Sequence, residues 1–124
     1  MTETPQRYAE VFDVRAALSS VGGDREYLAE LVGLVKAAWP TVLADIREGM
    51  SRGDLRAVEA SARLAKSAAR NVSAKRAYES ALRLETAASR GDWLSAQAAL
   101  DKLECEVESL RFYLAMVGDG SCLD

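Results

Sequence analysis

Hydrophobic residues recur every three or four positions along most of this chain, with polar residues between them. This spacing places apolar side chains on one face of an α-helix, so it predicts a series of amphipathic helices and no strands. The most regular face belongs to a helix predicted from Trp93 to about Val117, and it comprises Ala96, Leu100, Leu103, Val107, Leu110, Leu114 and Val117. We expect the opposite face to be solvated; its polar residues are Asp101, Lys102, Glu104, Glu106, Glu108 and Arg111.

Four further helices are predicted ahead of that one. A short helix begins after Asp13, and long helices follow over about 24–50, 55–71 and 74–89. Glycine ends a helix readily, and an aspartate directly after it caps the next helix. The two Arg-Gly-Asp sequences are therefore interpreted as helix boundaries, and an adhesion role is not expected.

Short connections between long helices favour antiparallel neighbours. We therefore predict an all-α fold, an antiparallel up-down four-helix bundle with a short extra N-terminal helix. The bundle should occupy residues 11–117, with a polar leader at 1–10 and a polar tail at 118–124. A monomer or a weak homodimer is expected, and an exchange of helices between two copies is the alternative.

Length and composition limit the number of domains, the location and the catalytic groups that this chain can have. The 124 residues suffice for one domain, and no apolar run approaches the roughly 20 residues of a membrane span. The N-terminus lacks the apolar stretch of a secretion signal, so we expect a cytoplasmic protein that binds no membrane, with Cys105 and Cys122 reduced. The chain contains no histidine, which excludes imidazole-based catalysis, and no metal or cofactor is expected.

The segment from Arg52 to Arg76 is basic, although the chain as a whole is acidic. It holds seven Lys or Arg residues and two acids, a net +5, so a total of −3 leaves −8 for the rest. Three- and four-residue steps place on one face Glu59, Arg63, Lys66 and Arg70. The plain interpretation is a solvated face of an alanine-rich helix. Small residues there would also admit a close neighbour, inside the bundle or on a partner: Ala60, Ala62, Ala65, Ser67, Ala68 and Ala69.

The same helix resembles the central helix of histidine phosphotransfer domains, the four-helix relay modules of bacterial multistep phosphorelays. The family phrase is Ala-His-x-Leu-Lys-Gly-x-Ala-x-Asn-Ile-Gly-Ala, and residues 62–74 read ARLAKSAARNVSA. Lys66, Asn71 and Ala74 match outright, Val72 is a conservative match, and glycines are replaced by Ser67 and Ser73. The likeness extends over about residues 11–117 through Phe12-Asp13, Gly22-Gly23-Asp24, Leu84-Glu85 and Arg90-Gly91-Asp92.

Arg63 stands where the family has its phosphorylated histidine. Arginine stays protonated and is a poor nucleophile, so the resemblance implies a signalling module of a two-component system that carries no phosphohistidine and has no enzymatic activity. It further implies docking on a response-regulator receiver domain, whose active site is a pocket of aspartates, or on a sensor kinase. The docking residues implied in this way are Arg63, Lys66, Ser67, Arg70 and Glu59.

Three other functions are considered beside this one. A helical scaffold or oligomerisation protein, unrelated to phosphorelays, would use an apolar surface away from Arg63. An enzyme could use Glu104 and Glu108, one helical turn apart, but no nucleophile–base pair or phosphate loop accompanies them. Nucleic-acid binding is not expected, because the basic segment lacks interleaved aromatic residues.

Overall fold

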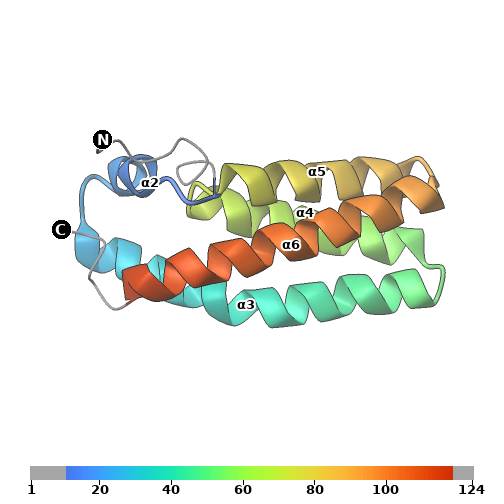
Figure 1. Ribbon diagram of the computed structural model, residues 1–124, viewed down its shortest axis with the longest axis horizontal. Coiled ribbons are helices and arrows are strands. Elements are labelled where there is room, and N and C mark those ends of the chain that lie inside the picture. The colour runs from blue at the N-terminus through green and yellow to red at the C-terminus, as the bar shows by residue number, and fades with distance from the viewer. Residues whose placement is uncertain (1–10, 119–124) are drawn as a thin grey trace.

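The computed structural model describes the backbone of residues 11–118 and the side chains of residues 11–115. This part of the chain is helical apart from short connections and contains no strand, as the hydrophobic spacing predicted. Its helices are α2 (Val14–Ser20), α3 (Arg25–Ser51), α4 (Leu55–Asn71), α5 (Lys75–Ser89) and α6 (Trp93–Gly118) (Figure 1). The predicted leader at 1–10, most of the predicted tail, and Cys122 lie outside the described residues.

Aspartate side chains cap the start of four helices, as the sequence predicted. Each carboxylate accepts a hydrogen bond of 3.0 or 3.1 Å from the backbone N–H three residues later, and the four are Asp13, Asp24, Asp54 and Asp92. These bonds satisfy N–H groups that lack a partner within the helix. Both Arg-Gly-Asp sequences are helix boundaries of this kind, since Gly53 and Gly91 adopt φ values of 70° and 71° that favour glycine.

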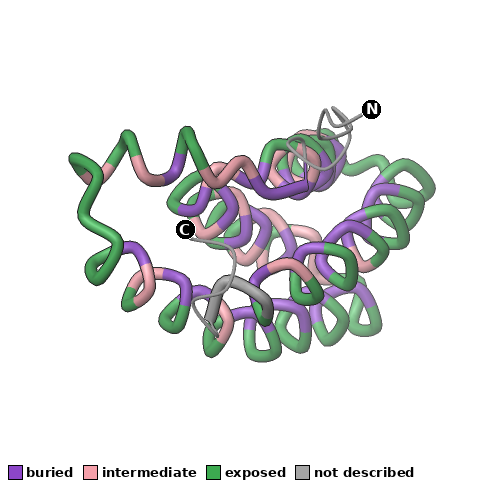
Figure 2. Tube along the Cα trace, turned by 60° about the vertical axis from the view of Figure 1, so that its left-hand side comes forward, coloured by how far each residue is buried: buried purple, intermediate pink, exposed green. Residues whose placement is uncertain are grey.

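Consecutive helices pack against each other, and the last one returns to the first long one. α4 contacts both α3 and α5, α5 contacts α6, and α6 contacts α3, while the short α2 lies against α3. The four long helices therefore surround a common core (Figure 1). Figure 2 shows that the buried residues of each long helix gather on the side facing the others, which is the arrangement that a three- and four-residue hydrophobic spacing requires.

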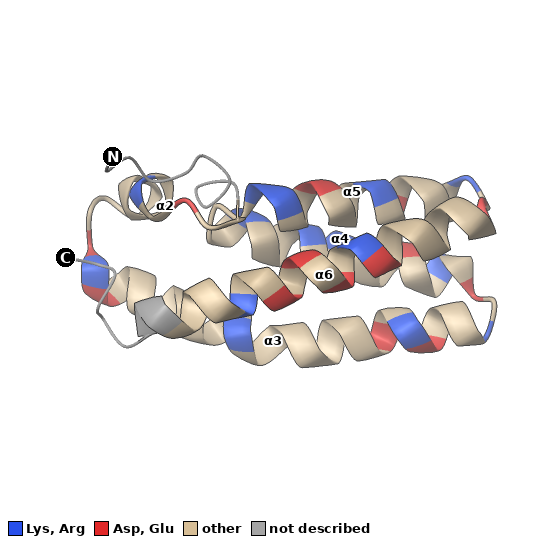
Figure 3. Cartoon of the chain, in the orientation of Figure 1, with Lys and Arg blue, Asp and Glu red and all other residues tan. Residues whose placement is uncertain are grey.

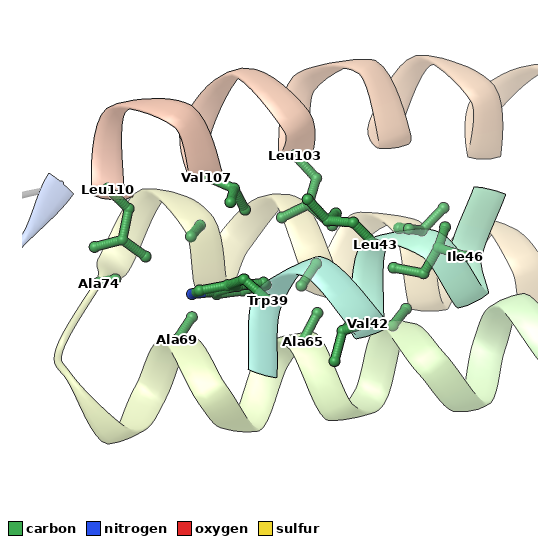
Figure 4. Close-up of a cluster of buried hydrophobic side chains, with 14 of the residues drawn as sticks. Trp39, Val42, Leu43, Ile46, Ala65, Ala69, Ala74, Leu103, Val107 and Leu110 are labelled. Atoms are coloured by element: carbon green, nitrogen blue, oxygen red, sulfur yellow. The ribbon is translucent and has the colours of Figure 1, made fainter. Parts of the chain in front are cut away.

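Trp39 of α3 fills the middle of this core and has no exposed surface. Figure 4 shows its indole between Val107 of α6 and two alanines of α4, Ala65 and Ala69, which are also fully buried. The small side chains on this face of α4 thus accommodate a large neighbour inside the bundle, which is one of the two alternatives left open by the sequence. The indole Nε1 has no hydrogen-bond partner among the described residues.

The composition of α3 is apolar well beyond its core face. An 18-residue stretch has a mean hydropathy of 1.3, so the helix is long and apolar enough to cross a membrane by length and composition. About 28% of that stretch is buried within the bundle, and both core helices of soluble proteins and signal sequences near an N-terminus meet the same criterion. The cytoplasmic location therefore stays a prediction.

Candidate functional site

Two of the predicted docking residues, Arg63 and Lys66, reach from α4 to one carboxylate on α5. The Nζ atom of Lys66 lies 2.7 Å from Oε1 of Glu85, and Nε of Arg63 donates to Oε2 of Glu85 at 3.0 Å. Glu59, one turn earlier on α4, lies 3.5 Å from Nη2 of Arg63. Figure 3 shows basic residues on both α4 and α5. Arg63, Lys66, Glu59 and Glu85 form what we call the Arg63 network.

Glu85 is the most enclosed member of the Arg63 network. Its side chain is 13% exposed, and its Oε1 atom is shielded from solvent, so the Lys66 ammonium supplies the compensating charge. The Lys66 contact lowers the pKa of Glu85 most strongly, burial opposes this, and Arg63 lowers the pKa further, leaving it below its ordinary value of 4.5. Glu85 is therefore ionised at neutral pH and engages both cations.

Arg63 remains open to a partner in spite of these contacts. Its side chain is 59% exposed, and a guanidinium carries five N–H donors, more than its two contacts with Glu59 and Glu85 use. Ser67, one turn later, is exposed as well. The chemistry available on this face is ionic recognition of carboxylates or phosphates, since a protonated guanidinium cannot act as a nucleophile.

An exposed leucine lies beside Arg63, outside the residues that the sequence predicts for docking. Leu64 is 59% exposed on the outward side of α4, with Ala60 and Ser67 exposed one turn to either side. An apolar side chain left in solvent next to a cation is a common element of protein-binding surfaces. Its signal was available in the sequence, because Leu64 falls outside the three- and four-residue pattern that defines the core face of α4.

Arg70 belongs to a different set of contacts from Arg63 and Lys66. Its Nη2 atom donates to the hydroxyl of Tyr78 on α5 at 3.2 Å, and its guanidinium carbon lies 5.4 Å from the centre of the Tyr78 ring. Such contacts hold the arginine against the aromatic ring. Of the five predicted docking residues, the structure thus joins Arg63, Lys66 and Glu59 and places Arg70 in a separate contact.

The prediction that the polar face of α6 is solvated is wrong for Glu106. Its side chain is only 5% exposed, and its Oε2 atom accepts a hydrogen bond from Nη2 of Arg76 at 3.0 Å and lies 3.5 Å from Nζ of Lys102. A cavity of about 300 Å³ adjoins it between α5 and α6, with Ser80 and Arg83 also in its lining. The register gives the physical reason, because Glu106 follows the buried Leu103 by three residues and precedes the buried Leu110 by four.

The other chemical groups considered from the sequence do not gather into a site. Glu104 forms an ion pair with Arg47 of α3, and Glu108 is exposed, so the two carboxylates are not presented together. Cys105 is an exposed free thiol. No group of three or more His, Cys, Asp or Glu residues able to hold a metal ion occurs in the part of the chain that the structure describes.

Comparison of the chain with protein-family models, with curated protein sequences and with solved structures finds no match. The resemblance to histidine phosphotransfer domains therefore rests on the sequence phrases alone.

Proposed function

We propose that this chain is a histidine phosphotransfer-like signalling module of a two-component system that cannot carry phosphohistidine. It binds a receiver domain or a sensor kinase through the outward side of α4. The observation that carries the proposal is the 59% exposure of Arg63, which stands at the position of the family's phosphorylated histidine. A fixed positive charge there suits a partner whose surface holds clustered carboxylates.

The helix order supports this assignment. Four long helices that contact one another in sequence, with a short helix ahead of them, agree with an antiparallel up-down four-helix bundle and an extra N-terminal helix. The turn after α4 adds a specific point of agreement. Ser73 replaces a glycine of the family phrase, and it adopts a φ of 56°, the left-handed conformation that glycine takes most readily.

Two further features support recognition at this face rather than catalysis. Leu64 and Ser67 are exposed beside Arg63, so the same surface offers an apolar contact and a hydroxyl next to the cation. Recognition would combine burial of Leu64, which stabilises a complex by about 1 to 3 kcal/mol when complete, with pairing of Arg63 to a carboxylate. No catalytic step is proposed.

The proposal is tested by titrating receiver domains and kinase domains from the source organism against the wild-type protein and Arg63→Glu. Reversing the charge should weaken binding by at least tenfold, because an acid replaces a cation that faces carboxylates. Arg83→Glu is the matched control: it makes the same charge change on α5, at the cavity toward α6. Equal weakening by both variants, or no binding to any of these domains, would reject the proposal.

A second candidate is a scaffold that self-associates through α3. Leu34 is 69% exposed, and the exposed side of α3 continues through Ala37, Ala38 and Thr41 without a charge between Lys36 and Asp45 (Figure 3). An apolar strip of this kind is typical of interaction surfaces. Sedimentation of Leu34→Glu against the wild type separates the candidates, since a scaffold of this type would lose its oligomer while receiver binding through Arg63 would not change.

A further inference from the structure

We propose that Glu85 is an internal competitor for Arg63 and Lys66, which an acidic partner must displace in order to bind this face. The inference rests on the proposed function and names the kind of partner that fits: a surface with at least two neighbouring carboxylates. It follows from the geometry of the Arg63 network. Adding up the charges along the sequence does not show which side chains pair with one another.

The two cations are already neutralised within the protein. Arg63 and Lys66 contribute two positive charges, and Glu59 and Glu85 contribute two negative charges within 3.5 Å of them. Each carboxylate oxygen of Glu85 has its own cation, Lys66 at Oε1 and Arg63 at Oε2. An approaching partner therefore meets a balanced ionic network at this place, although the surrounding segment carries a net charge of +5.

The members of the network differ in how accessible they are. The Arg63 side chain is 59% exposed, whereas the side chains of Lys66 and Glu85 are 20% and 13% exposed. A partner can consequently touch Arg63 first, through the donors that Glu59 and Glu85 leave unused. Lys66 is mostly covered and already paired with Glu85 at 2.7 Å, so we expect a partner to engage both cations fully by exchanging its carboxylate for that of Glu85.

This exchange discriminates among partners. A single external carboxylate would replace one ion pair by an equivalent one and gain little. A pair of carboxylates can engage Arg63 and Lys66 together and recover more than the exchange costs. Glu85 also lowers the affinity for every acidic partner. Only the fraction of molecules in which Arg63 and Lys66 are free can bind fully, and the apparent affinity is the intrinsic affinity multiplied by that fraction.

The test uses a tri-aspartate peptide as the acidic probe and follows the amide resonances of α4 and α5 in the isotopically labelled full chain. Glu85→Gln removes the competing charge and should tighten peptide binding by about tenfold, a change equivalent to about 1.4 kcal/mol. Glu79→Gln is the control, because Glu79 is exposed on α5 and makes no ion pair with the residues that the structure describes. This variant changes the net charge equally and should bind the peptide within twofold of the wild type.

Tightening by the same factor in both variants, or in neither, would overturn the inference. If Glu85→Gln fails to fold, Glu85→Asp serves instead, since its side chain is one methylene shorter and should pair less well with the two cations; it should tighten binding by a smaller factor. The same titrations with receiver domains keep the two proposals apart. Receivers that bind the wild type through Arg63 but bind Glu85→Gln no more tightly would reject the competitor alone. Peptide tightening without any receiver binding would reject the proposed function alone.

Discussion

A methyl group added to Gly49 of α3 would lie 2.9 Å from Cγ2 of Val58 on α4, closer than real side-chain contacts allow. The added carbon would also lie 3.4 Å from the carbonyl oxygen of Asp54. The side chain of Val58 is short and fully buried, so it cannot swing aside as the end of a long side chain could. The two helices can approach this closely near their connection because residue 49 has no side chain.

Gly49→Ala should therefore destabilise the protein by about 1 to 2 kcal/mol, since the overpacking cost exceeds the roughly 1 kcal/mol that alanine gains over glycine in a helix. Gly33→Ala provides the matched comparison on the same helix. Nothing lies within 4 Å of the methyl group it would add, so it should stabilise the protein by about 0.5 to 1 kcal/mol. Urea unfolding of both variants measures the two signs, and a stabilising Gly49→Ala would show that the helices are not in this contact.

Glu106→Gln should destabilise the protein by about 1 to 3 kcal/mol. The substitution leaves the side chain in place but removes the charge that Arg76 and Lys102 share, and Arg76 is only 36% exposed. Glu108→Gln, two residues along the same helix and exposed, should stay within about 0.5 kcal/mol of the wild type. Thermal unfolding at pH 7 compares the two, and equal effects would mean that the ion pairs of Glu106 do not contribute to stability.

The helices and their ends were predictable because local chemistry determines them. Hydrophobic spacing marks the core faces, and the Gly-Asp boundaries combine a residue that ends a helix with one that begins the next. The predicted helix ranges agree with the observed ones to within a residue or two, as for α5 at Lys75–Ser89. The residue with positive φ after the end of α4 is Ser73. Backbone hydrogen bonds from residues 73 and 74 to Arg70 and Ala69 fix that position, and composition alone does not reveal them.

Pairing between helices was much harder to anticipate. The sequence places Arg63 and Lys66 on one face of α4. It does not indicate that Glu85, nineteen residues after Lys66, pairs with both cations. The sequence pattern places Glu106 on the face opposite the core, whereas the structure buries it between the registers of Leu103 and Leu110. In both cases a carboxylate and its cations come from different helices, and their contact depends on how the helices are rotated against each other.

The turn at Ser73 allows a test with two identical substitutions of opposite expected effect. Ser73→Gly should stabilise the protein by about 0.5 to 1 kcal/mol, because a left-handed conformation costs residues with a side chain about 1 to 2 kcal/mol and glycine recovers most of that. Its hydrogen bonds use backbone atoms, including the carbonyl oxygen that accepts from the N–H of Asp13 at 3.2 Å, and are kept in the variant. Ser67→Gly in the middle of α4 should cost about 0.5 kcal/mol, since glycine weakens a helix interior. Denaturant unfolding distinguishes the two, and a destabilising Ser73→Gly would mean that the turn is not strained.

The pH dependence of stability should report the ion pairs of Glu85. Contacts with Lys66 and Arg63 hold its pKa in the folded protein below the ordinary value of 4.5, so the folded state binds the proton more weakly than the unfolded chain does. The resulting stabilisation is fully present above about pH 5 and is lost as the pH falls through the folded pKa. Glu85→Gln should therefore be less stable than the wild type by about 1 kcal/mol at pH 7, a value kept small by solvent screening at this partly open site. The difference should shrink steadily as the pH falls below 4.5.

In a Lys66→Met background the same substitution should have a smaller effect at pH 7 and a weaker pH dependence, because the largest contribution to the lowered pKa of Glu85 is gone. A Glu85→Gln effect of equal size at pH 7 and pH 3 would instead show that Glu85 acts through its packing and not through its charge.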